Sequence, residues 1–379
     1  MQRIVVVGAG LAGARSVQEL RAQGHTGEVV LLGAEPHLPY DRPPLSKDLL
    51  LGTTDDSTLD GELDADVRLG VRATRLRPGV VETTGGDVGY DGLVLATGAA
   101  PRGLGAGLTL RTVDDARALR ARLVPGARVV VIGAGWIGAE VATASARAGC
   151  RTTVLEGGQA PLGIPLGVEL GARTIDWYAE LGIELRLGAA VAAVEPDRVT
   201  LAGGEQLAAD LVVVGIGATP DTAWLADSGL ELDRGVVVDE HLAASWPGVV
   251  AAGDCAAWWS RRFGTRLRVE HWDDALHAPT TAVATLLGGA AVHDPVPYFW
   301  SDQLGHRLQY TGHHDGADTV LLREGGDSWS ACWLLAGRLV AVLAVDRPRD
   351  LLQGRRRIEA GATPDPVRLA DPAVSVKDA

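Results

Sequence analysis

Lysine is almost absent from this sequence of 379 residues: Lys47 and Lys377 are the only two, and arginine supplies the rest of the 35 basic residues. Acidic residues number 48, so the formal net charge is −13. That charge argues against a general affinity for nucleic acid or for an anionic membrane, because both partners require a basic domain. Where nearly every cation is arginine, a lysine in a proline-rich loop suggests a site that needs a compact point charge. Chance retention of Lys47 is the alternative.

Cysteine is also scarce. Cys150, Cys255 and Cys332 lie far apart and form no CxxC pair. This spacing excludes a disulfide framework, a four-sulfur metal site and an adjacent redox pair, so we expect structural burial. Long apolar runs of membrane-spanning length are absent, and the sequence enters a strand without a signal-peptide pattern, which predicts a cytoplasmic protein. Its 46% hydrophobic content is enough for two or three cores.

Glycine, by contrast, is abundant and placed in a pattern. Residues 4–13 read IVVVGAGLAG, an apolar run followed by Gly8, Gly10 and Gly13 in the spacing GxGxxG. This pattern predicts a buried parallel strand that turns tightly into a helix whose N-terminus faces a pyrophosphate. Residues 129–138 repeat it as VVVIGAGWIG, and every glycine is displaced by the same 125 positions. Two copies predict two bound dinucleotides.

An acidic residue follows each glycine motif at a similar distance along the sequence. Glu35 lies 22 residues after Gly13, and Glu156 lies 18 residues after Gly138. At about this distance an acidic side chain accepts hydrogen bonds from a ribose 2′-hydroxyl, and it would repel a 2′-phosphate, so Glu156 predicts a preference for NADH. The alternatives are a solvated loop acid and a solvated strand-end acid. Arg151 could reach the second site only if the backbone bends unexpectedly.

The surrounding layout is repeated as well. A hairpin and a return strand over 80–98 have a counterpart over 199–217, and Pro101 and Pro220 each stand three residues after a glycine. Two modules of one design are therefore nested. We predict that residues 1–103 and 222–293 form one dinucleotide-binding domain, that residues 104–221 form the other, and that residues 294–379 form a small α+β domain.

Residues 38–49, LPYDRPPLSKDL, form a proline-rich loop in which Ser46 is a plausible helix cap. Disulfide reductases built on paired Rossmann units carry their redox cysteines here, and this loop has none. With its PYxRPPLSK element, the sequence resembles the flavoprotein NADH:ferredoxin reductases that serve bacterial oxygenases and cytochromes P450. The segments RVEHWDDA at 268–275, VVAAGD at 249–254 and PYFWSDQ at 297–303 match further family elements. Two segments, 56–67 and 100–110, are short for the family, and the first leaves little room for the helix that usually precedes the hairpin strands.

The resemblance implies a glutathione-reductase-like α/β fold, with FAD in the first unit and NAD in the second. It implies that Lys47 lies beside the flavin ring and that Glu140 faces the nicotinamide and can pair with Lys47; a helix-surface acid is the alternative for Glu140. It implies that Asp254 binds the ribityl chain and that Trp272 packs near the flavin, although a plain core tryptophan is the alternative. The full set of implied cofactor-binding residues is Gly8, Gly10, Leu11, Ala12, Gly13, Glu35, Arg42, Lys47, Ala73, Ala96, Thr97, Gly98, Arg111, Gly133, Gly135, Trp136, Ile137, Gly138, Glu140, Glu156, Gly217, Gly253, Asp254, Glu270, His271 and Trp272.

The activity that this implies is electron transfer from NADH through FAD to an iron–sulfur ferredoxin, by a monomer or weak homodimer. A ferredoxin is expected to be acidic, so arginines at 261, 262, 266 and 355–357 are docking candidates, with a solvated surface as the alternative. No metal cluster stands out, because His313 and His314 lack further ligands. Two other functions stay open: a redox-sensing or scaffold flavoprotein, and an NADH oxidase.

Overall fold

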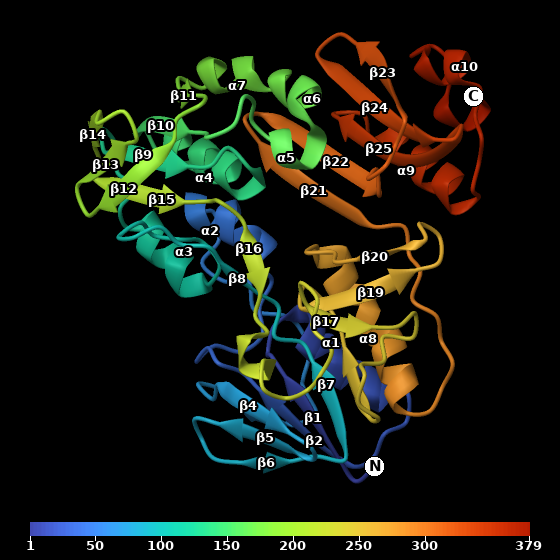
Figure 1. The fold of residues 1–379 in the computed structure, drawn as a ribbon. Helices are drawn as coiled ribbons and strands as arrows, with labels where there is room; N and C mark the ends of the chain where they lie inside the picture. Colours follow the sequence, from blue (N-terminus) through green and yellow to red (C-terminus); the bar gives the residue numbers. More distant parts are fainter.

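Five parallel strands form the sheet of the first unit in the computed structural model, which describes all of residues 1–379 (Figure 1). Their order is β18-β7-β1-β2-β3. Val, Ile and Leu fill the strand interiors with almost no exposed area, as expected for a parallel sheet covered on both faces. Helices α1 and α8 pack on each other beside it. The bounds are β1 Arg3–Val7, α1 Leu11–Ala22, β2 Glu28–Leu32, β3 Asp66–Arg68, β7 Gly92–Leu95, β18 Val249–Ala251 and α8 Trp272–Leu286.

Strand β18 joins this sheet only after the chain has built a second one. The second sheet is also parallel, in the order β11-β10-β9-β15. Each unit carries a small antiparallel sheet, β4-β5-β6 in the first and β12-β13-β14 in the second. The bounds are β4 Ala73–Arg77, β5 Val80–Thr83, β6 Val88–Gly89, α3 Val113–Arg120, β9 Arg128–Ile132, α4 Trp136–Arg147, β10 Arg151–Leu155, α5 Gly163–Leu166, α6 Val168–Ala172, α7 Ile175–Glu180, β11 Glu184–Arg186, β12 Val191–Glu195, β13 Arg198–Leu201, β14 Gln206–Ala208 and β15 Leu211–Val214.

The chain crosses between the two units twice, and the crossings pair with each other. Strands β8 (Ala99–Pro101) and β16 (Ala218–Pro220) run antiparallel, with Ala99 opposite Pro220 and Pro101 opposite Ala218. The two equivalent prolines thus lie at opposite ends of one short ladder. Figure 1 shows this ladder between the lower and the upper part of the molecule.

The C-terminal unit is a five-stranded antiparallel sheet in the order β21-β22-β25-β24-β23, with α9 packed on β25 and β22. Short elements fill the remaining chain. The bounds are η1 Pro43–Ser46, α2 Asp48–Leu51, η2 Ala223–Leu225, β17 Val236–Val238, β19 Ala256–Ser260, β20 Thr265–Leu267, β21 Tyr298–Gln303, β22 His306–Gly312, β23 Thr319–Gly325, β24 Ser328–Leu335, β25 Arg338–Val345, α9 Pro348–Glu359, α10 Pro366–Ala370 and η3 Val376–Asp378.

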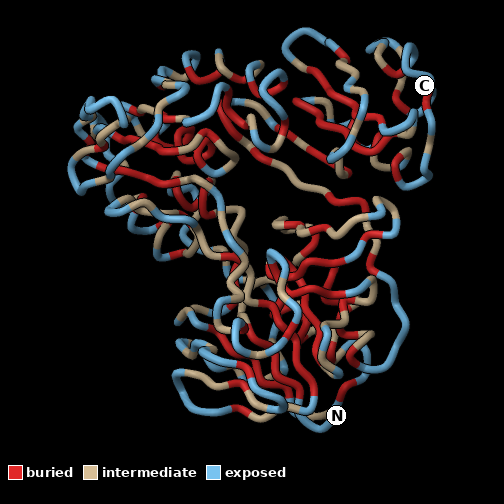
Figure 2. The backbone as a smooth tube through the Cα atoms, viewed as in Figure 1, coloured by how far each residue is buried: buried red, intermediate tan, exposed pale blue.

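Two large hydrophobic cores account for most of the buried residues (Figure 2). One core of 33 residues belongs to the first unit. The other, of 34 residues, joins strand β9 and helix α4 of the second unit to the C-terminal sheet. Tyr40, Leu45 and Leu49 of the proline-rich loop lie in this second core, although their sequence precedes β7 of the first unit. The loop is therefore anchored in the core of the second unit.

The nested α/β fold with its C-terminal antiparallel domain confirms the expected fold class, while the domain boundaries remain predictions. No helix forms between α2 and β3, as the short segment 56–67 suggested. The expected helix cap was wrong: Ser46 ends η1, and its hydroxyl bonds a distant carboxylate. Cys255 and Cys332 are buried thiols and Cys150 is partly exposed. None of the helices is both long and apolar enough to cross a membrane.

Candidate active site

The first glycine motif is built around contacts that only glycine allows. Gly8 has φ +111°, and a Cβ there would lie 2.1 Å from the carbonyl oxygen of Ala96. A Cβ on Gly13 would lie 1.8 Å from the carbonyl oxygen of Gly8, so α1 can pack this closely only without a side chain. Around Gly10 a Cβ would meet nothing within 4 Å. The helix N-terminus therefore faces open space with room for a phosphate group.

The second motif has the same geometry. A Cβ on Gly133 would lie 2.5 Å from the carbonyl oxygen of Gly215, and one on Gly138 would lie 1.9 Å from that of Gly133. Gly135, like Gly10, faces open space, since the nearest atom to its Cβ would be 3.9 Å away. Neither α1 nor α4 has an acidic residue in its first turn to occupy the anion position. Both cradles thus fit a dinucleotide pyrophosphate.

The interface between the first and second units, which we call the seam, contains an ion pair whose carboxylate is buried. Glu140 on α4 has only 4% of its surface exposed, so the helix-surface alternative was wrong. Its Oε2 lies 2.8 Å from Nζ of Lys47 and accepts a hydrogen bond from the Ser46 hydroxyl. Its Oε1 accepts a hydrogen bond of 2.6 Å from the hydroxyl of Ser301. A buried carboxylate requires such partners, and here they come from two separate segments of the chain.

Strand β21 of the C-terminal unit lies along this seam and places aromatic rings between helices α4 and α8. Phe299 stacks on His271 at 4.4 Å and meets the edge of Trp136 at 4.7 Å, which joins the starts of α8 and α4. Trp300 meets Trp272 edge to face at 5.9 Å. Burial lowers the pKa of His271 to about 4, so the ring is neutral at physiological pH.

Trp272 is held by a polar contact as well as by packing. Its indole N–H donates to Oδ1 of Asp41 at 2.8 Å, and Asp41 lies in the proline-rich loop. The plain core alternative for Trp272 is therefore too simple, because its position is fixed relative to the loop that carries Lys47. The proline-rich loop therefore contacts both units, with Asp41 bound to Trp272 of α8 and Lys47 bound to Glu140 of α4.

Glu35 lies in the loop after β2, beyond the first glycine motif, and its carboxylate is already engaged. Oε1 accepts from Arg42 at 2.9 Å, and Oε2 accepts from the Tyr40 hydroxyl at 2.5 Å. Burial raises the pKa of Tyr40 to about 12, so the phenol keeps its proton. Nearby, Arg111 donates to Oδ2 of Asp254 at 2.6 Å, directly after β18. These contacts bring four of the expected residues to one edge of the first sheet.

Glu156 occupies the corresponding place in the second unit. Its Oε2 accepts from the backbone N–H of Ala134, inside the glycine motif, at 2.8 Å, and its Oε1 accepts from Gly158 N–H at 2.7 Å. Arg151 begins β10 at the other end of the strand and does not reach this edge. Arg186, which ends the neighbouring strand β11, does lie at this edge, and Glu184 and Glu205 hold its guanidinium.

The remaining expected residues divide into those that shape the two cradles and those at their rims. Ala96, Thr97 and Gly98 follow β7, and Gly253 follows β18 against Ala12 of α1. Gly217 follows β15 in the same way, and Ala73 begins β4. Glu270 pairs with Arg268 just before α8. Leu11 and Ile137 lie in the first turns of α1 and α4, where Ile137 is exposed.

The arginine docking candidates are mostly committed elsewhere. Arg262 donates to the carbonyls of Ile358 and Glu359, and Arg266 donates to those of Val238 and Ala257. Arg261 pairs with Glu240 at the surface, Arg355 with Asp273 and Glu359, and Arg357 donates to the carbonyls of Lys377 and Ala379. Arg356 alone is exposed without such a partner. Internal contacts thus engage most of these arginines, and their role in docking remains a prediction.

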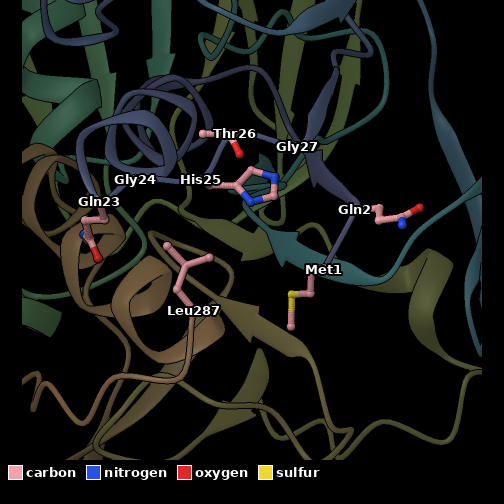
Figure 3. A pocket seen from close by; sticks show the side chains of 8 residues that line it. All are labelled: Met1, Gln2, Gln23, Gly24, His25, Thr26, Gly27 and Leu287. Carbon is pink, nitrogen blue, oxygen red and sulfur yellow. The ribbon is translucent and has the colours of Figure 1, made fainter.

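One cavity, whose lining side chains are drawn in Figure 3, lies away from this seam. It has a volume of about 490 Å³ and is lined by Met1, Gln2, the loop Gln23–Gly27 that follows α1, and Leu287. This is the edge of the first sheet where its strands begin, opposite the glycine motif. Ligands of open α/β sheets bind at the carboxyl ends of the strands, so this cavity is not the dinucleotide site.

Comparison with known proteins identifies the family of the chain. The family model described as pyridine nucleotide-disulphide oxidoreductase matches residues 2–278, and the model described as reductase C-terminal matches residues 298–379. The chain belongs to this oxidoreductase family, and within it to the ferredoxin reductases. This reductase is 37% identical to the ferredoxin reductase component of chlorobenzene dioxygenase from Cupriavidus sp. (strain PS12), over 99% of this chain and 97% of the relative.

Two solved structures resemble the reductase closely. The crystal structure of Fdr9 shares 52% identity with a TM-score of 0.95, over 99% of both chains. The reductase in the covalent putidaredoxin reductase–putidaredoxin complex shares 31% identity with a TM-score of 0.94, over 99% of this chain and 97% of that one. FAD and NAD are the dinucleotides of the family, and the two glycine cradles of this reductase fit them.

Sequence reasoning missed three groups at the seam. Ser46 and Ser301 contact the expected residue Glu140, and Phe299 contacts the expected residues Trp136 and His271. The sequence pattern predicts a helix cap for Ser46 and the opening of a domain for the other two. The alternation in β21 was the available signal, because Phe299 and Ser301 point to the same side of a strand.

Proposed function

We propose that this reductase passes electrons from NADH, through FAD, to a ferredoxin that supplies a cytochrome P450 or a ring-hydroxylating oxygenase. The observation that carries the proposal is the ion pair between Lys47, in the proline-rich loop without cysteines, and the buried Glu140 on α4, the helix that follows the second glycine motif. The names of the similar proteins support it, since they include ferredoxin reductase components of dioxygenases and a putidaredoxin reductase.

FAD, when bound, accepts a hydride from NADH and releases electrons singly to a one-electron partner. The chain's own task is to hold and orient the two dinucleotides. In our proposal the N-terminus of α1 and the open face of Gly10 hold the FAD pyrophosphate, while α4 and Gly135 hold that of NAD. Glu35 and Glu156 bind the two adenosine riboses through 2′-hydroxyl groups.

Lys47 and Glu140 form the electrostatic part of the site. Lys47 supplies a fixed positive charge on the side of the seam where negative charge accumulates on reduction, and because it is already in place it needs no rearrangement during the reaction. Glu140 is a hydrogen-bond acceptor for the nicotinamide carboxamide. The aromatic group of Trp136, Phe299 and His271 excludes water from the seam, which strengthens both interactions.

We further propose that the partner is an acidic ferredoxin and that Arg356 belongs to its docking surface. Arg356 is exposed in the last turn of α9 and makes no internal ion pair or hydrogen bond through its side chain, unlike Arg355 and Arg357. Electron-transfer encounters are weak and electrostatically steered, so a single free arginine changes their rate measurably. The reductase works as a monomer or a weak homodimer.

Steady-state reduction of cytochrome c through a series of bacterial [2Fe–2S] ferredoxins tests the proposed function. NADH-dependent reduction should require both the reductase and one of the ferredoxins, and ferricyanide should be reduced without ferredoxin. If ferricyanide reacts but every ferredoxin leaves the rate unchanged, and the reduced protein persists in air, a redox-sensing flavoprotein replaces the proposed activity.

A further inference from the structure

Glu140 receives its hydrogen bonds asymmetrically. Lys47 and Ser46 both contact Oε2, whereas Ser301 is the only partner of Oε1. Ser301 is 1% exposed and lies 161 positions away from Glu140, on β21 of the C-terminal unit. The second oxygen of the carboxylate is therefore held by a different domain from the first.

A second hydrogen bond fixes the place of β21 on α4. The backbone N–H of Leu304, just beyond β21, donates to the hydroxyl of Thr143 at 2.8 Å. Thr143 is buried and stands one helical turn after Glu140, on the same face of α4. Two contacts one turn apart thus set the position of the strand along the helix, and Ser301 is held opposite the carboxylate.

Loss of the Ser301 hydroxyl would leave a buried carboxylate oxygen without a donor. Such an oxygen is unfavourable, and the remaining partners all act on Oε2. The carboxylate can then turn toward any other donor within reach, which loosens its contact with Lys47. Misplacement of a positioning group by about 1 Å can lower a rate by as much as about 10²-fold.

We propose that Ser301 is a positioning residue for hydride transfer: it fixes Glu140 against Lys47, so that the C-terminal unit sets the geometry of the nicotinamide site. This proposal rests on the proposed function only in that NADH reduces the bound FAD. It does not depend on the identity of the electron acceptor.

Anaerobic stopped-flow measurement of FAD reduction by NADH tests the proposal without ferredoxin. Ser301→Ala should lower the limiting rate about tenfold, with a smaller change in the dissociation constant for NADH, because orientation rather than nucleotide binding is lost. Ser301→Cys has nearly the same volume and a weak donor, and it should give an intermediate rate. It also keeps the test valid if the alanine variant folds poorly.

A matched control separates positioning from general packing. Ser330→Ala removes another buried serine–carboxylate hydrogen bond of the C-terminal sheet, from Ser330 to Asp350 at 2.8 Å. It should lower the unfolding temperature and leave the reduction rate unchanged. In a Glu140→Gln background, Ser301→Ala should have little further effect on the rate, because the serine acts through the carboxylate.

The two lysines of the chain provide a readout that does not involve the flavin. Lys47 is held by Glu140, and Lys377 is exposed near the C-terminus. Acetylation followed by mass spectrometry should show Lys47 reacting several-fold faster in Ser301→Ala than in the wild type, with Lys377 as an internal reference. The proposal is overturned if Ser301→Ala reduces FAD at the wild-type rate, if its effect adds fully to that of Glu140→Gln, or if the reactivity of Lys47 is unchanged.

Discussion

The nicotinamide preference of the reductase depends on the environment of Glu156. No cation is free beside its carboxylate, because Glu184 and Glu205 hold Arg186. A 2′-phosphate placed about 6 Å away would be repelled by about 1.4 kcal/mol for each of its charges, at an effective dielectric constant of about 40. Each 1.36 kcal/mol corresponds to about a tenfold ratio. We therefore predict that kcat/KM for NADH exceeds that for NADPH at least about tenfold.

Two variants separate the charge of Glu156 from its structural role. Glu156→Gln keeps an acceptor for Ala134 N–H or Gly158 N–H. It should narrow the ratio of kcat/KM for NADH to that for NADPH, mainly by raising kcat/KM for NADPH. Glu156→Ala combined with Gly157→Arg should narrow it further or reverse it, and a side chain fits at Gly157 because a Cβ there meets nothing within 4 Å. Steady-state ferricyanide reduction with both nucleotides measures the ratios. Equal efficiency of the wild type with both, or a ratio unaffected by Glu156→Gln, would refute the assignment.

Three further predictions follow from the seam and the surface. Lys47→Ala should keep FAD but slow its reduction by NADH about 10²-fold; stopped-flow reduction at the wild-type rate would exclude a role for this charge. Arg356→Glu should raise KM for ferredoxin at low salt and leave ferricyanide reduction intact. The control Arg262→Glu should mainly lower the unfolding temperature, because Arg262 holds the end of α9. Ferredoxin kinetics unaffected by Arg356→Glu would remove α9 from the docking surface. The pKa of His271 is lowered to about 4 in the folded protein, so the unfolded state binds more protons between pH 6.5 and 4, and stability falls as the pH drops through that window. His271→Phe should weaken this pH dependence of the free energy of unfolding, measured with urea. An unchanged slope of that free energy against pH would contradict a buried neutral imidazole.

Local patterns predicted the repeated part of the fold well. The equal spacing of Gly8 and Gly133 indicated two units of one design, and Pro101 and Pro220 marked the two crossings that pair as β8 and β16. These features depend on residues close together in sequence.

Contacts between distant segments could not be predicted from such patterns. Leu45 and Leu49 lie in the core of the second unit although their sequence belongs to the first. The hydrophobic effect is non-directional, so a local pattern shows that a leucine is buried but not in which core. The burial of Glu140 depends on Ser301, which lies 161 positions away. Arg262 and Arg266 resemble surface arginines in the sequence, and only the folded chain brings carbonyl groups to them.

The central claim, that two dinucleotides meet at the Lys47–Glu140 seam and pass electrons to a ferredoxin, is tested most directly by an anaerobic titration of the purified holoprotein. One equivalent of NADH should bleach the visible absorbance of oxidised FAD, and two equivalents of oxidised ferredoxin should restore it, because the donor gives two electrons and the acceptor takes one. A protein whose flavin absorbance NADH does not bleach, or whose bleached form ferredoxin does not reoxidise, would contradict the account.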